Sequence, residues 1–145
     1  FWSTRPFFTE PRKLLFGSMT KQMINYVTVP EFDKDFKTLS KKFRTLEKDF
    51  GHMKKYTIET FYEKGVPTTA FVPIEGFCGE NYTSNKMRKF SCQSLKGRGS
   101  ASGIRVIFIW EEETRKITFI EIYFKADQAN ENKERLQKFI KENFG

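Results

Sequence analysis

IRVIFIWEEETRKITFIEIYF (Ile104–Phe124) is the stretch that decides the fold. Two segments within it, Ile104–Trp110 and Ile117–Phe124, are apolar on both faces, which is typical of central strands covered by helices. The polar residues between them, Glu111–Lys116, predict a hairpin turn. Together these segments predict the centre of a small sheet.

A run of positive charge leads into the first of these strands. The window KMRKFSCQSLKGRGSASGIR (86–105) contains no acidic residue, and its cationic residues are Lys86, Arg88, Lys89, Lys96, Arg98 and Arg105. Lys and Arg elsewhere are largely matched by Asp and Glu, so this window accounts for most of the net charge of +8. Such a local cluster predicts a surface for a polyanion, most often a nucleic-acid backbone. A solvated basic face that keeps the protein soluble is the alternative.

The chain before residue 63 predicts a strand followed by a helical hairpin. Ile24–Val29 is rich in β-forming residues and stops at Pro30, which suits a first helical turn. The apolar residues that follow recur at spacings of four, three and four, as in an amphipathic helix: Phe32, Phe36, Leu39 and Phe43. Thr45 is expected to cap a second helix that continues to about Tyr62.

Three further segments complete the expected fold. Gly65–Asn85 contains Gly, Pro, Asn and Thr without clear periodicity, which predicts an irregular connection. Met87–Leu95 is expected to form a strand, and NENKERLQKFIKENFG (130–145) a helix. The order β-α-α-β-β-β-α predicts an α+β fold, with helices on one side of a small, mostly antiparallel sheet.

Length and composition restrict the class of protein. A chain of 145 residues suits one domain, with no stretch long enough to span a membrane and no signal peptide. Cys78 and Cys92 are expected to be free thiols in a reducing cytoplasm, and neither a metal-ligand cluster nor a cofactor motif is present. FWSTRPFFTEPRKLLFGS (1–18) ends in Gly-Ser before Met19, which predicts a cloning-derived tag or fused peptide followed by a single domain, 19–145.

The phrase LKGRGSASGIRVIFIW, the run ITFIEIYFKADQ and the helical tail resemble the RelE/ParE superfamily of bacterial and archaeal toxins. The most specific features are a basic second strand, a Gly/Ser turn and a Gly-x-Arg that opens the next strand. The resemblance implies a RelE-like fold and a toxin of a type II toxin–antitoxin system. RelE-type members cleave mRNA on the ribosome. The implied partners are a cognate antitoxin, mRNA and the ribosome, with no cofactor and no membrane.

The resemblance also implies which residues act. In RelE-type enzymes the activity rests on basic residues of the sheet and an aromatic hydroxyl in the last helix. The third-strand arginine matches Arg105, which would clamp the scissile phosphate. Lys96 and Arg98 match the second-strand pair that assists proton transfer or holds the flanking backbone, and Lys125 is the candidate on the fourth strand. The RNA backbone is expected to bind Lys86, Arg88 and Lys89.

Cleavage of RNA without a metal requires removal of the 2′-hydroxyl proton, neutralisation of phosphorane charge and protonation of the leaving oxygen. His52 is the only histidine and lies in the helical hairpin, so a histidine pair is excluded. The C-terminal helix contains no tyrosine, so Tyr123 is the candidate stacking platform or proton donor. Glu121 shares its strand face and is a candidate general base. For both residues, an ordinary sheet-surface role is the alternative.

Two other functions stay open. ParE-type members of the superfamily inhibit DNA gyrase by binding it and are not nucleases, and a homologue can also bind RNA without cutting it. The basic residues discriminate between the possibilities, because a protein-binding inhibitor does not require Lys96, Arg98 and Arg105 to converge around one phosphate. Side chains that point apart would favour the inhibitor or the homologue that does not cut.

Overall fold

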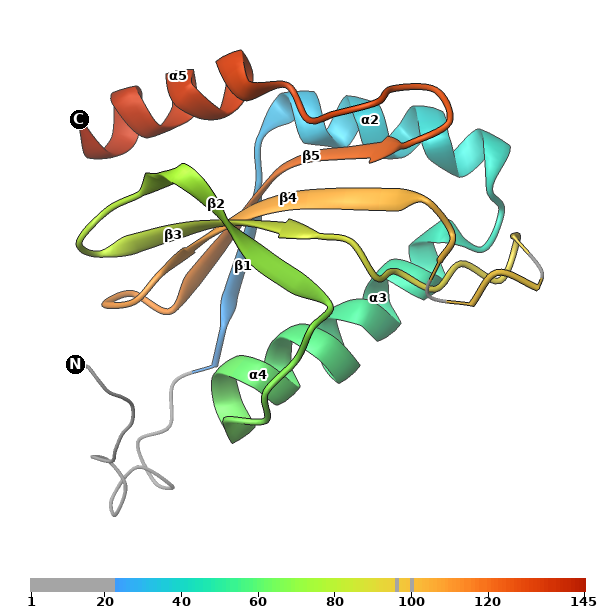
Figure 1. Cartoon of the computed structure of the whole chain (residues 1–145), viewed down its shortest axis with the longest axis horizontal. Coiled ribbons are helices and arrows are strands. Elements are labelled where there is room, and N and C mark those ends of the chain that lie inside the picture. The colour runs from blue at the N-terminus through green and yellow to red at the C-terminus, as the bar shows by residue number, and fades with distance from the viewer. Residues whose placement is uncertain (1–22, 96, 100) are drawn as a thin grey trace.

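The computed structural model describes residues 23–95, 97–99 and 101–145, which form a five-stranded mixed sheet with helices on both faces (Figure 1). The strands are β1 (Asn25–Thr28), β2 (Phe71–Cys78), β3 (Tyr82–Met87), β4 (Ile104–Glu111) and β5 (Lys116–Phe124). Their order across the sheet is β1-β5-β4-β3-β2. All neighbours are antiparallel except β1 and β5, which are parallel. The predicted α+β class is confirmed.

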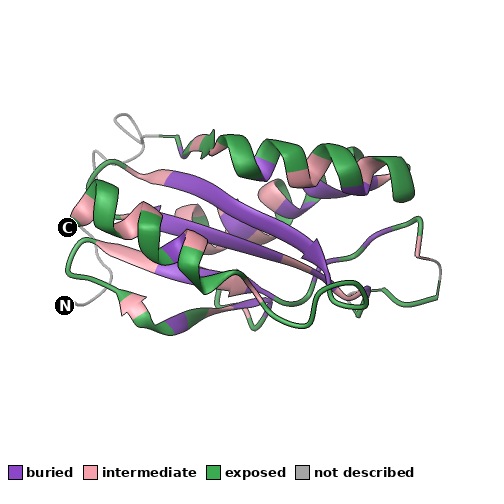
Figure 2. Cartoon of the chain, turned by 90° about the horizontal axis from the view of Figure 1, so that it is seen from above, coloured by how far each residue is buried: buried purple, intermediate pink, exposed green. Residues whose placement is uncertain are grey.

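The centre of the sheet is the pair of strands predicted from the sequence. β4 and β5 are buried along nearly their whole length, as Figure 2 shows, and their register places Arg105 opposite Tyr123 and Trp110 opposite Ile117. The register shifts after Ile107. The predicted hairpin turn is also confirmed, and Arg115 within it adopts the left-handed conformation, with φ of 49°.

The predicted helical hairpin packs on one face of the sheet. It consists of α2 (Pro30–Lys42) and a continuous helix formed by α3 (Leu46–Met53), a π-helical turn (Lys54–Ile58) and α4 (Glu59–Lys64). The core on this face is rich in aromatic rings, with the Phe50 ring centroid 4.9 Å from that of Phe119. Thr45 occupies the N-cap position of α3, but its side chain accepts no hydrogen bond from a described amide of the helix. Its hydroxyl instead donates to Asp49.

α5 (Lys133–Phe144) covers the opposite face, so the expectation that all helices lie on one side was wrong. Leu136 of α5 belongs to a second, smaller core with Ile107, Ile109 and Ile120. The physical reason is that β4 and β5 are apolar on both faces, and each face needs a cover that excludes water. Arg135 of α5 also forms a 2.7 Å ion pair with Asp35 of α2.

The segment 65–85, expected to be irregular, instead contributes β2 and the start of β3, which pair as an antiparallel hairpin. The fold therefore has one strand more than expected. Pro73 is compatible with β2 because this strand lies at the edge of the sheet, where a missing N–H costs no ladder bond. Gly76 has φ of 87°, within an irregularity of the pairing between Pro73 and Cys78. In the sequence, an edge strand of this kind lacks the clear alternation of apolar and polar residues that identifies a strand.

The strand expected at 87–95 does not form, because β3 already ends at Met87. The amides of Arg88 and Lys89 both donate to the carbonyl of Ala70, so the chain turns away from β4. Residues 88–103, here called the basic loop, then connect β3 to β4. Phe90 and Cys92 are nevertheless buried in the larger core.

Two predictions from the sequence concern residues outside the described ranges. These are the foreign origin of 1–18 and the role of Lys96. Within the described ranges, no helix is both long enough and apolar enough to cross a membrane.

Candidate nucleic-acid interface

The basic residues of the sheet lie close together at the sheet end where β3 finishes and β4 begins. Arg105 is the second residue of β4 and lies opposite Tyr123. Its Nη1 donates to the backbone carbonyl of Arg88 over 3.0 Å, so Arg88 lies beside it. Lys86 is opposite Ile107, which places it on the same sheet face as Arg105. We call Lys86, Arg88 and Arg105 the basic patch.

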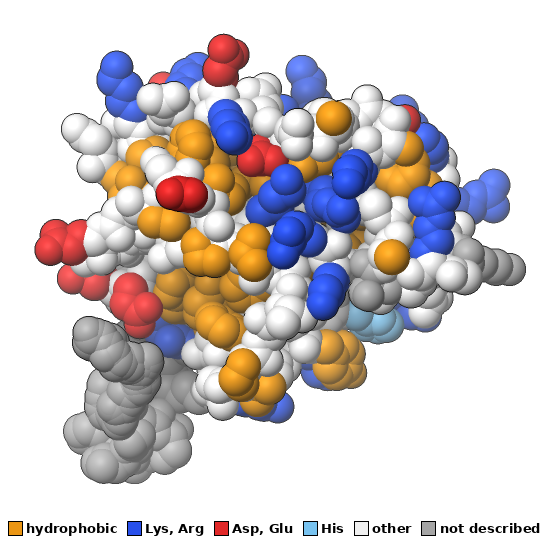
Figure 3. Space-filling model, viewed as in Figure 1, with side chains coloured by type: hydrophobic (Ala, Val, Ile, Leu, Met, Phe, Trp, Pro, Cys, Tyr) orange, Lys and Arg blue, Asp and Glu red, His pale blue; other side chains and the backbone are white. Residues whose placement is uncertain are grey.

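The patch is partly open to solvent. Arg88 is exposed, and Lys86 and Arg105 are half-buried. Figure 3 shows Lys and Arg side chains gathered near the middle of this view, while several acidic side chains lie toward one side of the molecule. The arrangement gives a local positive potential on one face.

Glu131 lies beside the patch and holds one of its members. Its Oε1 is 2.9 Å from Nζ of Lys86, and the Glu131 side chain is only 7% exposed. Burial acts to raise the pKa of Glu131, but the hydrogen bond from Lys86, a backbone hydrogen bond and the charges of Lys86 and Lys133 together outweigh it, so the pKa is lowered. Glu131 therefore stays ionised near neutral pH and orients Lys86.

Tyr123 lies under the patch with its ring in the smaller core. The residue is 4% exposed, and its buried hydroxyl forms no hydrogen bond of standard geometry with any described residue. Burial raises the pKa of the hydroxyl far above its usual range. The charges of Glu131 and Glu121 raise this pKa further, whereas the charge of Arg105 lowers it. The hydroxyl is thus a donor at neutral pH. The buried ring offers no open face for base stacking.

Glu121 is on the predicted face but is already engaged. One carboxylate oxygen accepts from the Gln128 side chain over 2.7 Å, and the other accepts from the Asn132 amide over 2.8 Å. Asn132 is the N-cap of α5 and accepts from the amide of Arg135. Glu121 therefore anchors the start of α5 to β5.

The remaining predicted site residues are more peripheral. Arg98 lies in the basic loop, and not on a strand as expected, because β3 ends eleven residues before it. It is exposed, and its Nη1 donates to the carbonyl of Ser102 within the same loop, over 3.3 Å. Lys125 is exposed beyond the end of β5, where its amide donates to Gly103 over 2.8 Å. No described hydrogen bond brings Arg98 to Arg105.

The basic loop is tied to the helical hairpin at its first half. Asp49 is buried, and its Oδ2 accepts from the Thr45 hydroxyl over 2.6 Å and from the Gln93 amide over 3.0 Å. The Ser94 amide in turn donates to the Thr45 hydroxyl. In the second half, the buried Ser102 hydroxyl donates to the carbonyl of Phe90. The bonds of Gln93 and Ser94 hold the first half of the loop beside α3.

Sequence reasoning missed Glu131, Gln128 and Asp49. Glu131 and Gln128 lie in a polar stretch before the last helix, where no pattern distinguishes them. Asp49 had a detectable signal, because it lies three residues after Leu46 and four before Met53, on the side of the predicted second helix that carries these apolar residues. A carboxylate at a buried helix position requires a partner.

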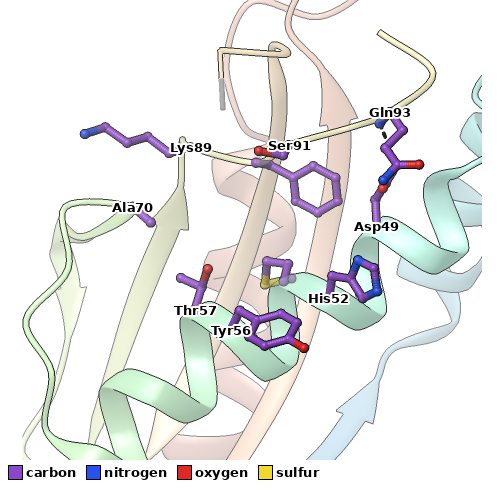
Figure 4. Close-up of a pocket in the computed structure, with 10 residues that line it drawn as sticks. Asp49, His52, Tyr56, Thr57, Ala70, Lys89, Ser91 and Gln93 are labelled. Atoms are coloured by element: carbon purple, nitrogen blue, oxygen red, sulfur yellow. Dashed lines mark hydrogen bonds between the residues drawn. The ribbon is translucent and has the colours of Figure 1, made fainter. Parts of the chain in front are cut away.

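A groove of about 350 Å³ lies on the hairpin side of the sheet, between α3 with its π turn and the start of the basic loop (Figure 4). His52 and Tyr56 line it from the helix, and Lys89, Ser91 and Gln93 line it from the loop. The side chain of Lys89 donates to the Thr69 hydroxyl over 2.7 Å.

Comparison with other proteins adds no assignment: no protein-family model, curated protein or solved structure matches this chain. Within residues 23–95, 97–99 and 101–145, no three His, Cys, Asp or Glu side chains gather in a way that could hold a metal ion.

Proposed function

We propose that the protein is a RelE-like toxin that cleaves mRNA on the ribosome, as a metal-independent endoribonuclease. The observation that carries the proposal is the position of Arg105, which lies opposite Tyr123 and hydrogen-bonds the Arg88 backbone on an open sheet face. A half-buried arginine between other cations is suited to hold a phosphate group of a chain.

Arg105 would act on the scissile phosphate. During attack by the 2′-oxygen, the phosphorus becomes five-coordinate and negative charge grows on its equatorial oxygens. A guanidinium group can donate two hydrogen bonds to such oxygens, which stabilises the transition state more than the ground state. Lys86 lies on the neighbouring strand β3 and Arg88 just beyond its end, and both would hold the neighbouring phosphates.

Two proton transfers complete the reaction. The 2′-oxygen loses its proton and bonds to phosphorus, the bond from phosphorus to the 5′-oxygen breaks, and the leaving oxygen gains a proton. The products are a 2′,3′-cyclic phosphate and a 5′-hydroxyl. Tyr123 keeps its proton at neutral pH, but its hydroxyl is buried beneath Arg105 and does not face the phosphate. The Lys86 ammonium, oriented by Glu131, would give a proton to the leaving 5′-oxygen, and solvent water would take the proton of the 2′-hydroxyl and return one to Lys86.

One observation favours a second candidate, an RNA-binding homologue that does not cut. The two carboxylates nearest the patch are poor bases as they stand. Glu121 has both oxygens engaged by Gln128 and Asn132, and the lowered pKa of Glu131 weakens it as a proton acceptor. Binding through the patch would require no proton acceptor.

A toxin of this kind implies a protein partner. We propose a cognate antitoxin in the same cytoplasm that neutralises the toxin with a segment that folds as it binds. A net charge of +8 favours an acidic segment.

The proposal is tested by primer extension on an mRNA translated in vitro in the presence of the protein. Cuts inside the open reading frame that require translation are the expected result, and Arg105→Ala serves as the inactive control. RNA binding without cuts would establish the second candidate. If the protein neither binds RNA nor cuts mRNA, the remaining candidate is an inhibitor that binds a protein target.

A further inference from the structure

We propose that the groove beside Tyr56 is a nucleobase site, which takes one unpaired base of an RNA strand whose backbone crosses the basic patch. The inference rests on the proposed binding of RNA. It adds a second contact of different chemistry, because the patch binds phosphates and the groove binds a base.

The groove has an aromatic wall that the fold leaves in solvent. Tyr56 is 64% exposed, which is unusual for a tyrosine on a helix that otherwise packs against a sheet. Its ring lies 5.9 Å from that of His52, in an edge-to-face arrangement. Exposed rings of this kind are the platforms on which proteins stack single-stranded bases, and every base has a face that can stack.

The helix is irregular at this wall. The π-helical turn Lys54–Ile58 interrupts the α-helix at Tyr56 and Thr57. Such turns are rare, and they frequently occur at functional sites because the extra residue redirects side chains. In Figure 4, Tyr56 and Thr57 lie across the groove from Lys89 and Ser91. The turn therefore contributes to the wall that faces the basic loop.

The rest of the lining matches a base in polarity and size. Met53, Ala70 and Phe90 are buried and give the groove apolar surface, while Ser91 and Gln93 are exposed and carry hydrogen-bonding groups. Flat apolar contact with a few polar groups at the edge is what recognition of an unpaired base requires. At about 350 Å³ the groove is at the small end for ligand sites, which favours one base over a folded peptide segment.

The groove and the patch are connected through consecutive residues. The carbonyl of Arg88 binds the Arg105 side chain, and Lys89, the next residue, lines the groove. A strand held by Arg105 and Arg88 on the α5 face would pass round the end of the sheet at Arg88 and Lys89 to reach the groove on the hairpin face. The positive charge of Lys89 suits the phosphate next to the bound base.

The first test is fluorescence anisotropy with a labelled, short single-stranded RNA. Tyr56→Ala is expected to weaken binding by about five- to 150-fold, as loss of one stacked base does, whereas Tyr56→Phe keeps the ring and the affinity. Lys48→Ala is the matched control, because Lys48 is exposed on α3 and does not line the groove. Thermal denaturation of each variant checks that the fold survives.

The second test places an abasic nucleotide at each position of the RNA in turn. In the wild-type protein one position is expected to lose affinity on removal of its base. In Tyr56→Ala the same removal is expected to have no further effect, since the stacking partner is already absent.

The outcomes separate the two proposals. A wild-type protein that binds RNA while Tyr56→Ala binds equally well overturns the base site alone and leaves the groove to a protein partner or to no ligand. A wild-type protein that does not bind the RNA but cuts mRNA during translation likewise overturns the base site alone, whereas one that does neither overturns the proposed function as well.

Discussion

The ammonium nitrogen of Lys86 lies 2.9 Å from Oε1 of Glu131, which joins strand β3 to the residue before the N-cap of α5. The two residues are 45 positions apart in the chain. The pair ties the connection before α5 to the sheet at the point where the basic patch begins. It also sets the charge of the patch, because Lys86 is partly neutralised while Arg88 and Arg105 are not engaged by a carboxylate in any described ion pair.

The pair predicts a pH dependence of stability. The pKa of Glu131 is lower in the folded state than its usual value of 4.5, so its contribution to stability is present above about pH 4.5. The contribution is lost as the pH falls through the lowered value. Urea denaturation at a series of pH values should show that Glu131→Gln removes part of the loss of stability in acid. Glu134→Gln, at an exposed position of α5, is the control, and equal acid sensitivity of both variants would contradict the prediction.

Arg105→Ala should abolish most of the toxicity while the fold survives. One charge contact in the transition state contributes about 3 kcal/mol or more, which corresponds to a rate lower by roughly 100- to 1000-fold. Arg105→Lys should restore little, because an ammonium group lacks the two parallel donors. Growth inhibition and mRNA cleavage measure the effect, with Arg44→Ala at an exposed position as the control. Full toxicity of a folded, normally expressed Arg105→Ala would remove this residue from the mechanism.

Binding to RNA or to the ribosome should weaken steeply with salt, since each phosphate contact releases counterions. For a single strand the slope of log affinity against log salt concentration is about −0.7 for each contact. Arg88→Ala should make the slope less steep by about that amount, whereas Lys141→Ala on the exposed side of α5 should not change it. An affinity independent of salt would show that the basic residues serve only solubility.

Glu121→Ala should lower stability and leave any catalytic chemistry intact. The substitution removes the acceptor for the Asn132 amide and the Gln128 side chain, at a cost of about 1–3 kcal/mol. Thermal denaturation should place Glu121→Gln between this variant and the wild type, because glutamine keeps one acceptor oxygen. The decisive measurement is mRNA cleavage by folded Glu121→Gln. A 100-fold loss without loss of stability would make Glu121 the general base and refute the anchoring role.

The elements that sequence reasoning predicted well are those with a strong local pattern. Ile104–Trp110 and Ile117–Phe124 are apolar on both faces, and the stripe from Phe32 to Phe43 recurs at helical spacing. β2 was missed because Pro73 and Gly76 weaken a local strand pattern, and only its place at the sheet edge permits them. Which strand lies at an edge depends on the packing order of the whole sheet.

The candidate site was predicted in part for the same reason. The sequence placed Arg105 on a strand next to the basic window, and the alternation of strand residues placed Tyr123 and Glu121 on one face. It could not show that Ala70 accepts the amides of Arg88 and Lys89, which ends β3 and releases the basic loop. That bond joins residues on either side of a hairpin that the sequence did not reveal.

By itself, the sequence determined the α+β class, the central strands and the helical stripes, because periodicity of apolar residues reflects burial on a face. It also determined where the uncompensated positive charge lies along the chain. Only the tertiary structure decided that α5 covers the second face, that Glu131 holds Lys86 and that Tyr56 borders a groove beside Lys89. These are contacts between distant segments, whose partners are selected by shape and charge after the chain has folded, and no local pattern encodes them.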